Sequence, residues 1–249
     1  KIERSVPKYG LNKDNQRKSK VIISLTSYDK RFTTLPLCLK SLLKQTVMPD
    51  KIILYLAEKD SSSITKQMKE LKQFGIEIVI VEGDLKPHKK YYYAMRDYPN
   101  AIVITVDDDV IYDKNLVRRL LLAHNNHPKT VIADRARLIK TSESGFSAYN
   151  SWELAKDVSK PSLELLATGV GGILYPPHVL DTDLLLSVQH IKKYISVDDL
   201  WLKAVEILSN TPTMTSVNNC KHSQYIDIHS SNQDSALSNT NVIKNENDK

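Results

Sequence analysis

The chain has 249 residues and is 41% hydrophobic, so it is long enough to bury the core of one α/β domain, with or without a small appendage. No apolar run approaches the ~20 residues that a membrane-spanning helix needs, and two cysteines are too few for a disulfide framework. The net charge of +6 suits anionic small molecules or an acidic membrane surface, whereas nucleic acid is discounted because base-reading motifs are absent.

The first third of the chain alternates strand and helix patterns. Residues 1–20 are polar and basic without an apolar period, which predicts a mobile N-terminal arm or a trimmed linker. Strands are predicted at 21–25, 51–56 and 76–81, and helices at 34–43 and 64–71, the first capped by Thr34 and the second followed by a stop at Gly75. This βαβαβ order indicates a mostly parallel sheet built from right-handed crossovers.

Two polar segments follow predicted strands. Residues 26–31 leave the first strand, and ligands of open α/β sheets bind beyond the carboxyl ends of strands, so this loop belongs to the binding edge. Asp84 closes the third strand, and Lys89 and Lys90 come soon after it. Lysines at that edge either form an ordinary solvated surface or neutralise phosphate, and the sequence leaves both interpretations open.

The central feature of the sequence is an apolar run at residues 101–110 that ends in three carboxylates. If the strand continues through them, Asp107 and Asp109 project to one side and Asp108 to the other. Two carboxylates on one side repel each other unless a cation lies between them, and Mg²⁺ and Mn²⁺ prefer oxygen ligands. An acidic turn that caps the next helix is the simpler alternative, but three aspartates after a buried strand favour a metal or phosphate site.

The second half of the chain contains fewer regular patterns. A helix is predicted from Asp113 to residue 127, a strand at 130–133, and a long loop, typical of a functional segment, at 142–160. Residues 168–177 are rich in glycine, which fits a tight turn as well as a close approach to a ligand.

A last strong helix opens at Asp198 and Asp199. Its predicted buried stripe is Leu200, Ala204, Ile207 and Leu208. The two aspartates either complement the helix dipole or carry chemistry. From residue 211 onward the chain is polar, and its last ~20 residues hold too little apolar surface to fold independently.

Five short motifs occur in a fixed order between about residue 21 and residue 208. They are Ser24-Leu25-Thr26-Ser27-Tyr28 with Arg31, Lys89-Lys90-Tyr91-Tyr92-Tyr93-Ala94, the D-x-D of Asp107 and Asp109, Thr168-Gly169-Val170-Gly171-Gly172 with Tyr175-Pro176-Pro177, and Asp198-Asp199-Leu200-Trp201-Leu202-Lys203. The set resembles bacterial sugar-nucleotide-dependent glycosyltransferases of the GT-A fold, particularly those that build surface polysaccharide. The resemblance implies a Rossmann-like nucleotide-binding half at 21–110 and an acceptor half at 111–210, between the basic arm 1–20 and a polar tail 211–249.

The resemblance also implies a nucleoside-diphosphate sugar donor and a divalent cation, Mn²⁺ or Mg²⁺. Asp109 would hold the cation that bridges both phosphates, with Asp107 on the ribose or sharing the metal. His222 and His229 are the candidates for a histidine that completes the metal site. The expected nucleotide-binding residues are Thr26, Ser27, Tyr28, Arg31, Asp84, Lys89, Lys90, Asp107 and Asp108.

On the acceptor side, the resemblance to inverting members points to Asp199 as the catalytic base, with Asp198 as the runner-up. A helix N-terminus would lower the pKa of this base, so it should be ionised at neutral pH. Gly171, Gly172 and Trp201 would shape the acceptor and donor-sugar side. The expected acceptor is a saccharide or lipid-linked saccharide of capsule or lipopolysaccharide biosynthesis, and the expected location is cytoplasmic, with peripheral contact with the inner membrane left open.

Other functions remain as alternatives. Retaining GT-A enzymes also use D-x-D, so inversion depends on the Asp198-Asp199 pair alone. A nucleotidyltransferase would need a glycine- and arginine-rich phosphate loop, and residues 26–31 contain no glycine. A phosphatase with an aspartate nucleophile would carry its acidic motif on the first strand, which has none. A sugar-nucleotide or carbohydrate-binding subunit without activity is disfavoured because both acidic motifs are present.

Overall fold

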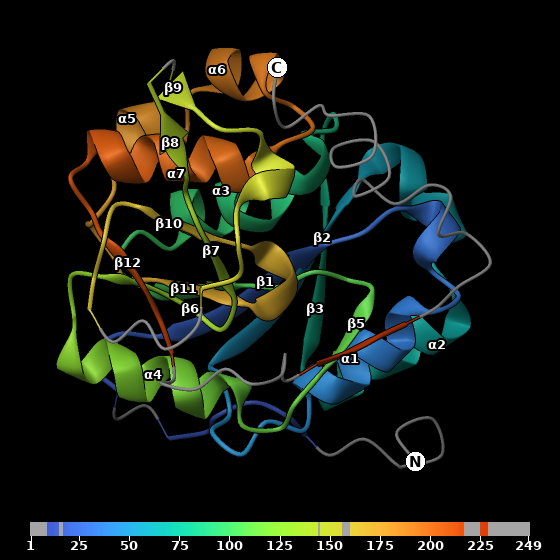
Figure 1. Cartoon of the computed structure of the whole chain (residues 1–249). Coiled ribbons are helices and arrows are strands. Elements are labelled where there is room, and N and C mark those ends of the chain that lie inside the picture. The colour runs from blue at the N-terminus through green and yellow to red at the C-terminus, as the bar shows by residue number, and fades with distance from the viewer. Residues whose placement is uncertain (1–8, 15–16, 144, 156–159, 217–224, 229–249) are drawn as a thin grey trace.

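A seven-stranded sheet forms the centre of the computed structural model, which describes residues 9–14, 17–143, 145–155, 160–216 and 225–228 (Figure 1). Its strands are β1 (Val21–Thr26), β2 (Lys51–Ala57), β3 (Ile76–Val81), β4 (Ile102–Thr105), β6 (Val131–Ala133), β11 (Ile173–Tyr175) and β12 (Thr213–Thr215). They lie in the order β12-β6-β11-β4-β1-β2-β3, and β11 alone runs antiparallel to its neighbours. The predicted mostly parallel α/β sheet is therefore confirmed.

Helices cover both faces of the sheet. They are α1 (Leu35–Leu42), α2 (Lys66–Leu71), α3 (Lys89–Asp97), α4 (Leu116–Asn126), α5 (Thr182–Leu185), α6 (Val188–Lys193) and α7 (Asp198–Leu208). In Figure 1, α3, α5, α6 and α7 lie above the sheet and α1, α2 and α4 lie below it. Ile23 of β1 packs into the lower core and Ile22 into the upper one, which explains why the strand sequence is apolar at every position.

Of the two residues predicted to bound the first helices, Gly75 acts as predicted and Thr34 does so only in part. Gly75 ends the short 3-10 helix η3 (Lys72–Phe74) that follows α2, and its φ of 115° is a left-handed conformation that glycine adopts without strain. Thr34 precedes α1 as predicted, but its hydroxyl donates to the carbonyl of Arg31 at 3.2 Å instead of capping the helix.

The central strand is shorter than predicted. β4 ends at Thr105, and the chain turns through the three aspartates before β5 (Val110–Tyr112). The backbone N–H of Asp107 donates to the Tyr112 hydroxyl at 2.8 Å, so Tyr112 holds the start of this turn. The alternation argument for Asp107 and Asp109 is therefore wrong in its premise, because these residues are not in a strand.

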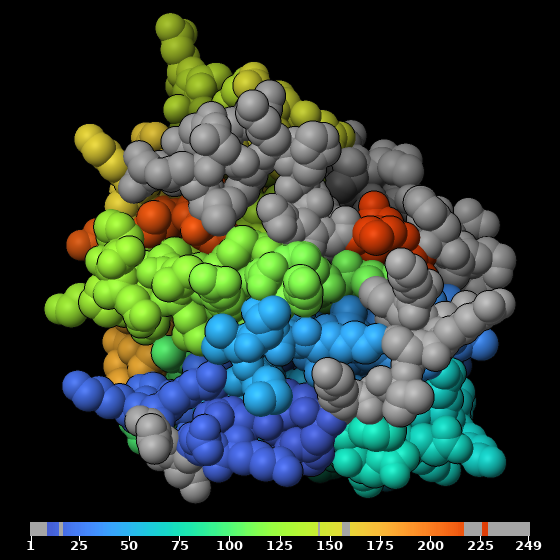
Figure 2. Space-filling view, turned by 90° about the horizontal axis from the view of Figure 1, so that it is seen from below, coloured from blue at the N-terminus to red at the C-terminus, as the bar shows by residue number. Residues whose placement is uncertain are grey.

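Both ends of the described chain are better ordered than predicted. Gly10 N–H donates to the Phe74 carbonyl at 2.8 Å, and Arg17 pairs with Asp50 at 3.1 Å, so residues 9–14 and 17–20 are not a free arm. Figure 2 shows them in dark blue at the surface seen from below. Beyond residue 210, β12 belongs to the main sheet and β13 (Tyr225–Asp227) pairs with β5, which corrects the prediction of a tail from 211 for these segments.

A small module projects from the sheet between β6 and β11. It consists of β7 (Ala136–Leu138) paired with β10 (Leu165–Ala167), the hairpin of β8 (Thr141–Ser142) and β9 (Gly145–Phe146), and the 3-10 helices η5 (Tyr149–Ser151) and η6 (Gly169–Gly171). Part of the predicted long loop at 142–160 is therefore regular structure. No helix in the described ranges is long and apolar enough to cross a bilayer.

The buried face of α7 is not the predicted one. Trp201, Leu202 and Val205 are buried against the upper core, whereas Ile207 is 42% and Leu208 68% exposed. Leu200 and Ala204 are only partly buried. The helix is turned so that Asp198 at its first position is buried as well, which brings its acidic end toward the sheet.

Candidate active site

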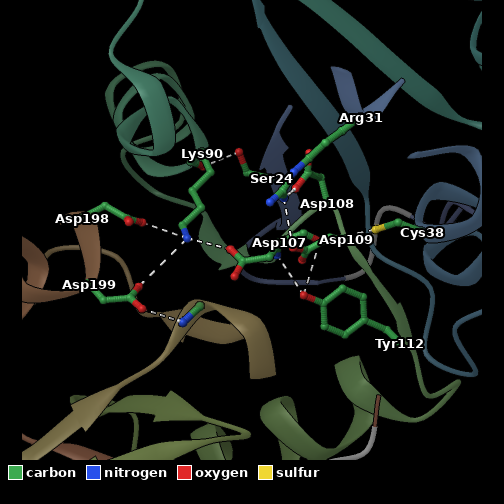
Figure 3. A network of polar contacts seen from close by, with 11 residues as sticks. Ser24, Arg31, Cys38, Lys90, Asp107, Asp108, Asp109, Tyr112, Asp198 and Asp199 are labelled. Carbon is green, nitrogen blue, oxygen red and sulfur yellow. Dashed lines mark hydrogen bonds and ion pairs between the residues drawn. The ribbon is translucent and has the colours of Figure 1, made fainter. Parts of the chain in front are cut away.

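The first cluster of charges lies where β1 and β4 end. These strands are parallel neighbours, so the loop after β1 meets the aspartate turn after β4 (Figure 3). The Arg31 guanidinium pairs with Asp108 and contacts Asp109 Oδ2 at 3.0 Å. Arg31 therefore joins the two segments that the sequence places at the binding edge.

The aspartate turn has unbalanced negative charge. Burial raises the pKa of Asp109 to about 6, and the charge of Asp107 adds to the rise in spite of Arg31. A divalent cation between the two carboxylates would relieve this repulsion. In the described part of the chain no group of three or more His, Cys, Asp and Glu side chains could hold a metal ion. The aspartate turn therefore fits an ion that one or two carboxylates would hold, with substrate phosphate and water as its other ligands, as is usual for Mg²⁺.

Two other candidates for metal binding lie outside the described residues. They are His222 and His229, so their predicted role is not tested.

A second cluster is centred on the Lys90 ammonium group. Lys90 Nζ lies 2.8 Å from Asp107 Oδ1, 2.8 Å from Asp198 Oδ2 and 4.0 Å from Asp199 Oδ1, and the side chain is 5% exposed (Figure 3). The Ser24 hydroxyl donates to the Lys90 carbonyl and fixes the start of α3 on β1. Lys90 thereby connects the aspartate turn with the start of α7.

Gly169 completes this second cluster. Its N–H donates to Asp199 Oδ2 at 3.0 Å, and a Cβ at this position would lie 2.5 Å from Lys90 Nζ and 2.9 Å from Asp107 Oδ1. A side chain at this position would therefore displace the Lys90 ammonium group or the Asp107 carboxylate. The site prediction omitted Gly169, although the glycine-rich run that contains it was a signal.

The charge states of the two acids on α7 differ from expectation. Burial raises the pKa of Asp199 to about 7, and the negative charges of Asp198 and Asp107 add to the rise in spite of Lys90 and the Gly169 N–H. Burial alone would also raise the pKa of Asp198, but Lys90 and then His88 outweigh it and lower that pKa. The helix N-terminus therefore does not keep Asp199 fully ionised at neutral pH, which corrects the prediction.

The loop after β1 contains the other predicted nucleotide contacts. The Thr26 hydroxyl donates to the Tyr55 carbonyl at 2.8 Å, and the Arg31 guanidinium lies 5.5 Å from the centre of the Tyr28 ring. Ser27 is buried, and its hydroxyl has no hydrogen-bond partner among the described residues. Such a hydroxyl is a candidate for a ligand contact.

Asp84 and Lys89 form a separate ion pair. Burial alone would raise the pKa of Asp84, but hydrogen bonds from Lys59 and Lys89 outweigh it and lower the pKa to about 2. Lys59 contacts Asp84 at 2.7 Å, and the Lys89 side chain is buried. The ammonium groups of Lys89 and Lys90 are thus both engaged by carboxylates, and their predicted contact with phosphate stays a prediction.

The three residues predicted for the sugar side pack against neighbouring side chains. A Cβ on Gly171 would lie 2.5 Å from the Arg135 Cβ, and one on Gly172 would meet Leu116 at 3.2 Å, so both glycines allow close packing. The Trp201 ring is buried and stacks on the rings of His190 and Tyr194, at centroid distances of 5.5 and 5.8 Å. The contacts of these three residues are internal.

A mostly parallel α/β sheet with acids gathered beyond the ends of β1 and β4 defines a nucleotide-binding domain of the GT-A type. The model of glycosyl transferase family 2 matches residues 22–166, more than half of the chain. The chain therefore belongs to glycosyl transferase family 2 and is a nucleotide-sugar glycosyltransferase, which confirms the resemblance to GT-A enzymes. No curated protein matches the chain in sequence.

Solved structures of similar fold come from distant proteins. The 4-diphosphocytidyl-2C-methyl-D-erythritol synthase of Anaerococcus prevotii is 13% identical with a TM-score of 0.50, and the match covers 91% of this chain and 96% of that one. TarS of S. aureus in complex with UDP is 12% identical with a TM-score of 0.47, and the match covers 80% of this chain and 59% of TarS. A mannosyltransferase from Pyrobaculum calidifontis, in complex with GDP-Man and Mn²⁺, is 12% identical with a TM-score of 0.43. That match covers 86% of this chain and 59% of the mannosyltransferase. At this identity the likeness concerns the fold alone.

Proposed function

We propose that this chain is a metal-dependent, inverting glycosyltransferase. It moves a sugar from a nucleoside-diphosphate donor to a saccharide or lipid-linked saccharide acceptor, in the biosynthesis of capsule or lipopolysaccharide. The observation that carries the proposal is the Lys90 ammonium group, which holds the aspartate turn 2.8 Å away on one side and the start of α7 2.8 Å away on the other. The acids proposed for the donor side and for the acceptor side therefore lie next to each other.

The donor side of this site consists of the loop after β1 and the aspartate turn. Asp109, with Asp107, would hold Mn²⁺ or Mg²⁺, and the ion would offset the negative charge of the departing diphosphate. Arg31 would add positive charge at the same place. Ser27 would offer its hydroxyl to the nucleoside.

The acceptor side consists of Asp199 and its supports. The Asp199 side chain is 29% exposed, against 11% for Asp198, so Asp199 is the acid that a hydroxyl group can reach. Asp199 would take the proton of that hydroxyl while its oxygen forms a bond to C1 of the donor sugar and the bond from C1 to the diphosphate breaks. A single displacement of this kind inverts the configuration at C1.

A thermal-shift screen of nucleoside diphosphates and sugar nucleotides, with and without Mn²⁺, tests the donor side. A ligand that binds only the folded state raises its stability, so we expect one nucleotide base to give a shift that requires the ion and is lost with EDTA. The absence of a shift with every nucleotide would instead favour a subunit without donor binding.

Replacing Asp109 by alanine should abolish the metal-dependent part of that shift, because one of the two carboxylates that would hold the cation is lost. Asp97→Ala is the matched control, since Asp97 is at the far end of α3 and pairs only with Arg96 in the described structure. An unchanged dependence on Mn²⁺ in Asp109→Ala would remove this residue from the metal site.

The rate of transfer should rise with pH. Below about pH 7 the pKa of Asp199 leaves the base mostly protonated, so kcat/KM should increase about tenfold per pH unit and level off above it. In Asp198→Asn the rising limb should move to lower pH, because the charge of Asp198 contributes to the raised pKa of Asp199. Rate profiles of the two proteins that rise at the same pH would contradict this assignment.

A further inference from the structure

Three aromatic side chains gather on the small module that projects from the sheet. Phe146, Tyr149 and Trp152 form this aromatic patch, with ring centroids 6.4 Å apart for Phe146 and Trp152 and 5.4 Å for Tyr149 and Trp152. Phe146 is 71% exposed and Tyr149 is partly exposed, while Trp152 is buried beneath them. Neither the donor site nor the base uses these rings.

The patch is held in place by polar contacts beneath it. The Trp152 indole N–H donates to the Ser147 carbonyl at 2.9 Å, and Arg137 donates to the Trp152 carbonyl. The Arg137 guanidinium also lies 5.2 Å from the centre of the Tyr149 ring. The Trp152 and Tyr149 rings are therefore preorganised, which lowers the entropy lost when a ligand binds.

The same module reaches the proposed base. Arg137 is in β7, which pairs with β10, and β10 leads directly to Gly169, whose N–H donates to Asp199 at 3.0 Å. Burial raises the pKa of the Tyr149 hydroxyl, and the charge of Asp199 is the next cause, so this ring lies within the electrostatic reach of Asp199. Figure 1 agrees, since η5 (yellow) lies over the N-terminal end of α7.

We propose that the aromatic patch is the binding subsite for a sugar ring of the acceptor, which assigns a saccharide acceptor to this enzyme. The inference depends on the proposed transferase function. The C–H groups on one face of a pyranose carry partial positive charge and pack on the negative face of an aromatic ring, while the hydroxyl groups at its edge stay free. A pyranose against Phe146 and Tyr149 would present such a hydroxyl toward Asp199.

The neighbouring charges favour a saccharide over a membrane surface. Lys140, the basic residue next to the hairpin, pairs with Glu153 at 2.7 Å. Arg137 is engaged by the Trp152 carbonyl and the Tyr149 ring. An anionic bilayer attracts clusters of basic side chains, whereas Lys140 is paired with an acid and Arg137 is engaged inside the module.

Phe146→Ala tests the proposal, because this exposed side chain can be removed without opening the core. Binding of the 249-residue chain to an array of bacterial surface glycans should be lost or weakened about tenfold or more, and KM for a retained glycan should rise by the same factor. Donor-induced thermal shift and kcat should stay within about twofold. Phe146→Trp should restore glycan binding, since a larger ring keeps the stacking face.

Leu122→Ala is the matched control, because Leu122 is a large exposed apolar residue on α4, on the other side of the sheet. The proposal is overturned if Phe146→Ala and the parent chain bind glycans equally well. It is also overturned if the parent chain shows the donor-induced thermal shift but binds no glycan. The second result would still be compatible with the proposed transferase function, whereas the absence of a donor-induced thermal shift in the parent chain would contradict that function. Loss of binding to phosphatidylglycerol vesicles in Phe146→Ala, with glycan binding unchanged, would assign the patch to the membrane instead.

Discussion

Replacing Asp199 by asparagine is expected to slow sugar transfer by about 10²–10⁴-fold, the usual contribution of a general base. The amide keeps the size of the side chain and its contact with the Gly169 N–H, but it cannot take a proton. Donor binding should survive, because the Asp199 carboxylate lies on the far side of Lys90 from the aspartate turn. Initial rates of transfer and the donor-induced thermal shift measure the two quantities separately.

Asp198→Asn is the control for this experiment and decides between the two acids. Asp198 is almost fully buried and lies 2.8 Å from the Lys90 ammonium group, so its substitution should act through Lys90 and lower the rate less than Asp199→Asn. Full transfer by Asp199→Asn together with loss of transfer in Asp198→Asn would move the base to Asp198. Comparable rates in all three proteins would place the base on another residue.

The sheet was predictable because its strands have simple sequence patterns. β1 and β2 are buried on both faces, and their continuous apolar runs, separated by amphipathic helices, specify a parallel α/β order without knowledge of tertiary contacts. The position of the acids followed from the same rule, since the carboxyl ends of parallel strands meet at one edge. Sequence reasoning placed Arg31 and the three aspartates at the same edge of the sheet but did not predict their contacts.

The contacts within the site were not predictable, because they depend on packing between distant elements. β4 ends at Thr105 because the chain turns back and offers the Tyr112 hydroxyl to the N–H of Asp107. A run of aspartates suits a turn as well as the end of a strand, so the sequence alone left both interpretations open. The buried face of α7 depends on the rings of His190 and Tyr194, which stack on Trp201. With Trp201 directed inward, Ile207 and Leu208 point away from the core, contrary to the predicted stripe.

The role of Lys90 shows how burial changes the meaning of a residue. In the sequence it belongs to a basic cluster that suits phosphate, as an exposed lysine would. In the fold its side chain is buried, and its charge is matched by Asp107 and Asp198. A buried cation among several carboxylates is costly to remove, because each acid then keeps its desolvation penalty without a partner. Lys90 should therefore affect stability more than any exposed charge at the site.

Lys90→Met should lower the free energy of unfolding by about 3–5 kcal/mol, the usual cost of removing one partner of a buried ion pair. For a chain of this length that loss corresponds to a fall in melting temperature of roughly 6–20 °C, which differential scanning calorimetry measures directly. The deficit should shrink as pH falls toward about 4, because protonation of the unpaired carboxylates removes their mutual repulsion and the folded variant then binds more protons than its unfolded chain. Transfer should also fail, since Asp107 and Asp198 would no longer be held together.

Two further variants distinguish this explanation from a simple loss of packing. Lys89→Met removes a neighbouring buried lysine whose partner, Asp84, keeps a second contact with Lys59 at 2.7 Å, so its melting temperature should fall less. Adding Asp198→Asn to Lys90→Met removes one of the stranded charges and should recover part of the lost stability, because the double variant buries less unpaired charge. If Lys90→Met melted like the parent chain, or if its deficit were independent of pH, the ammonium group would not be the link between the donor-side and acceptor-side acids.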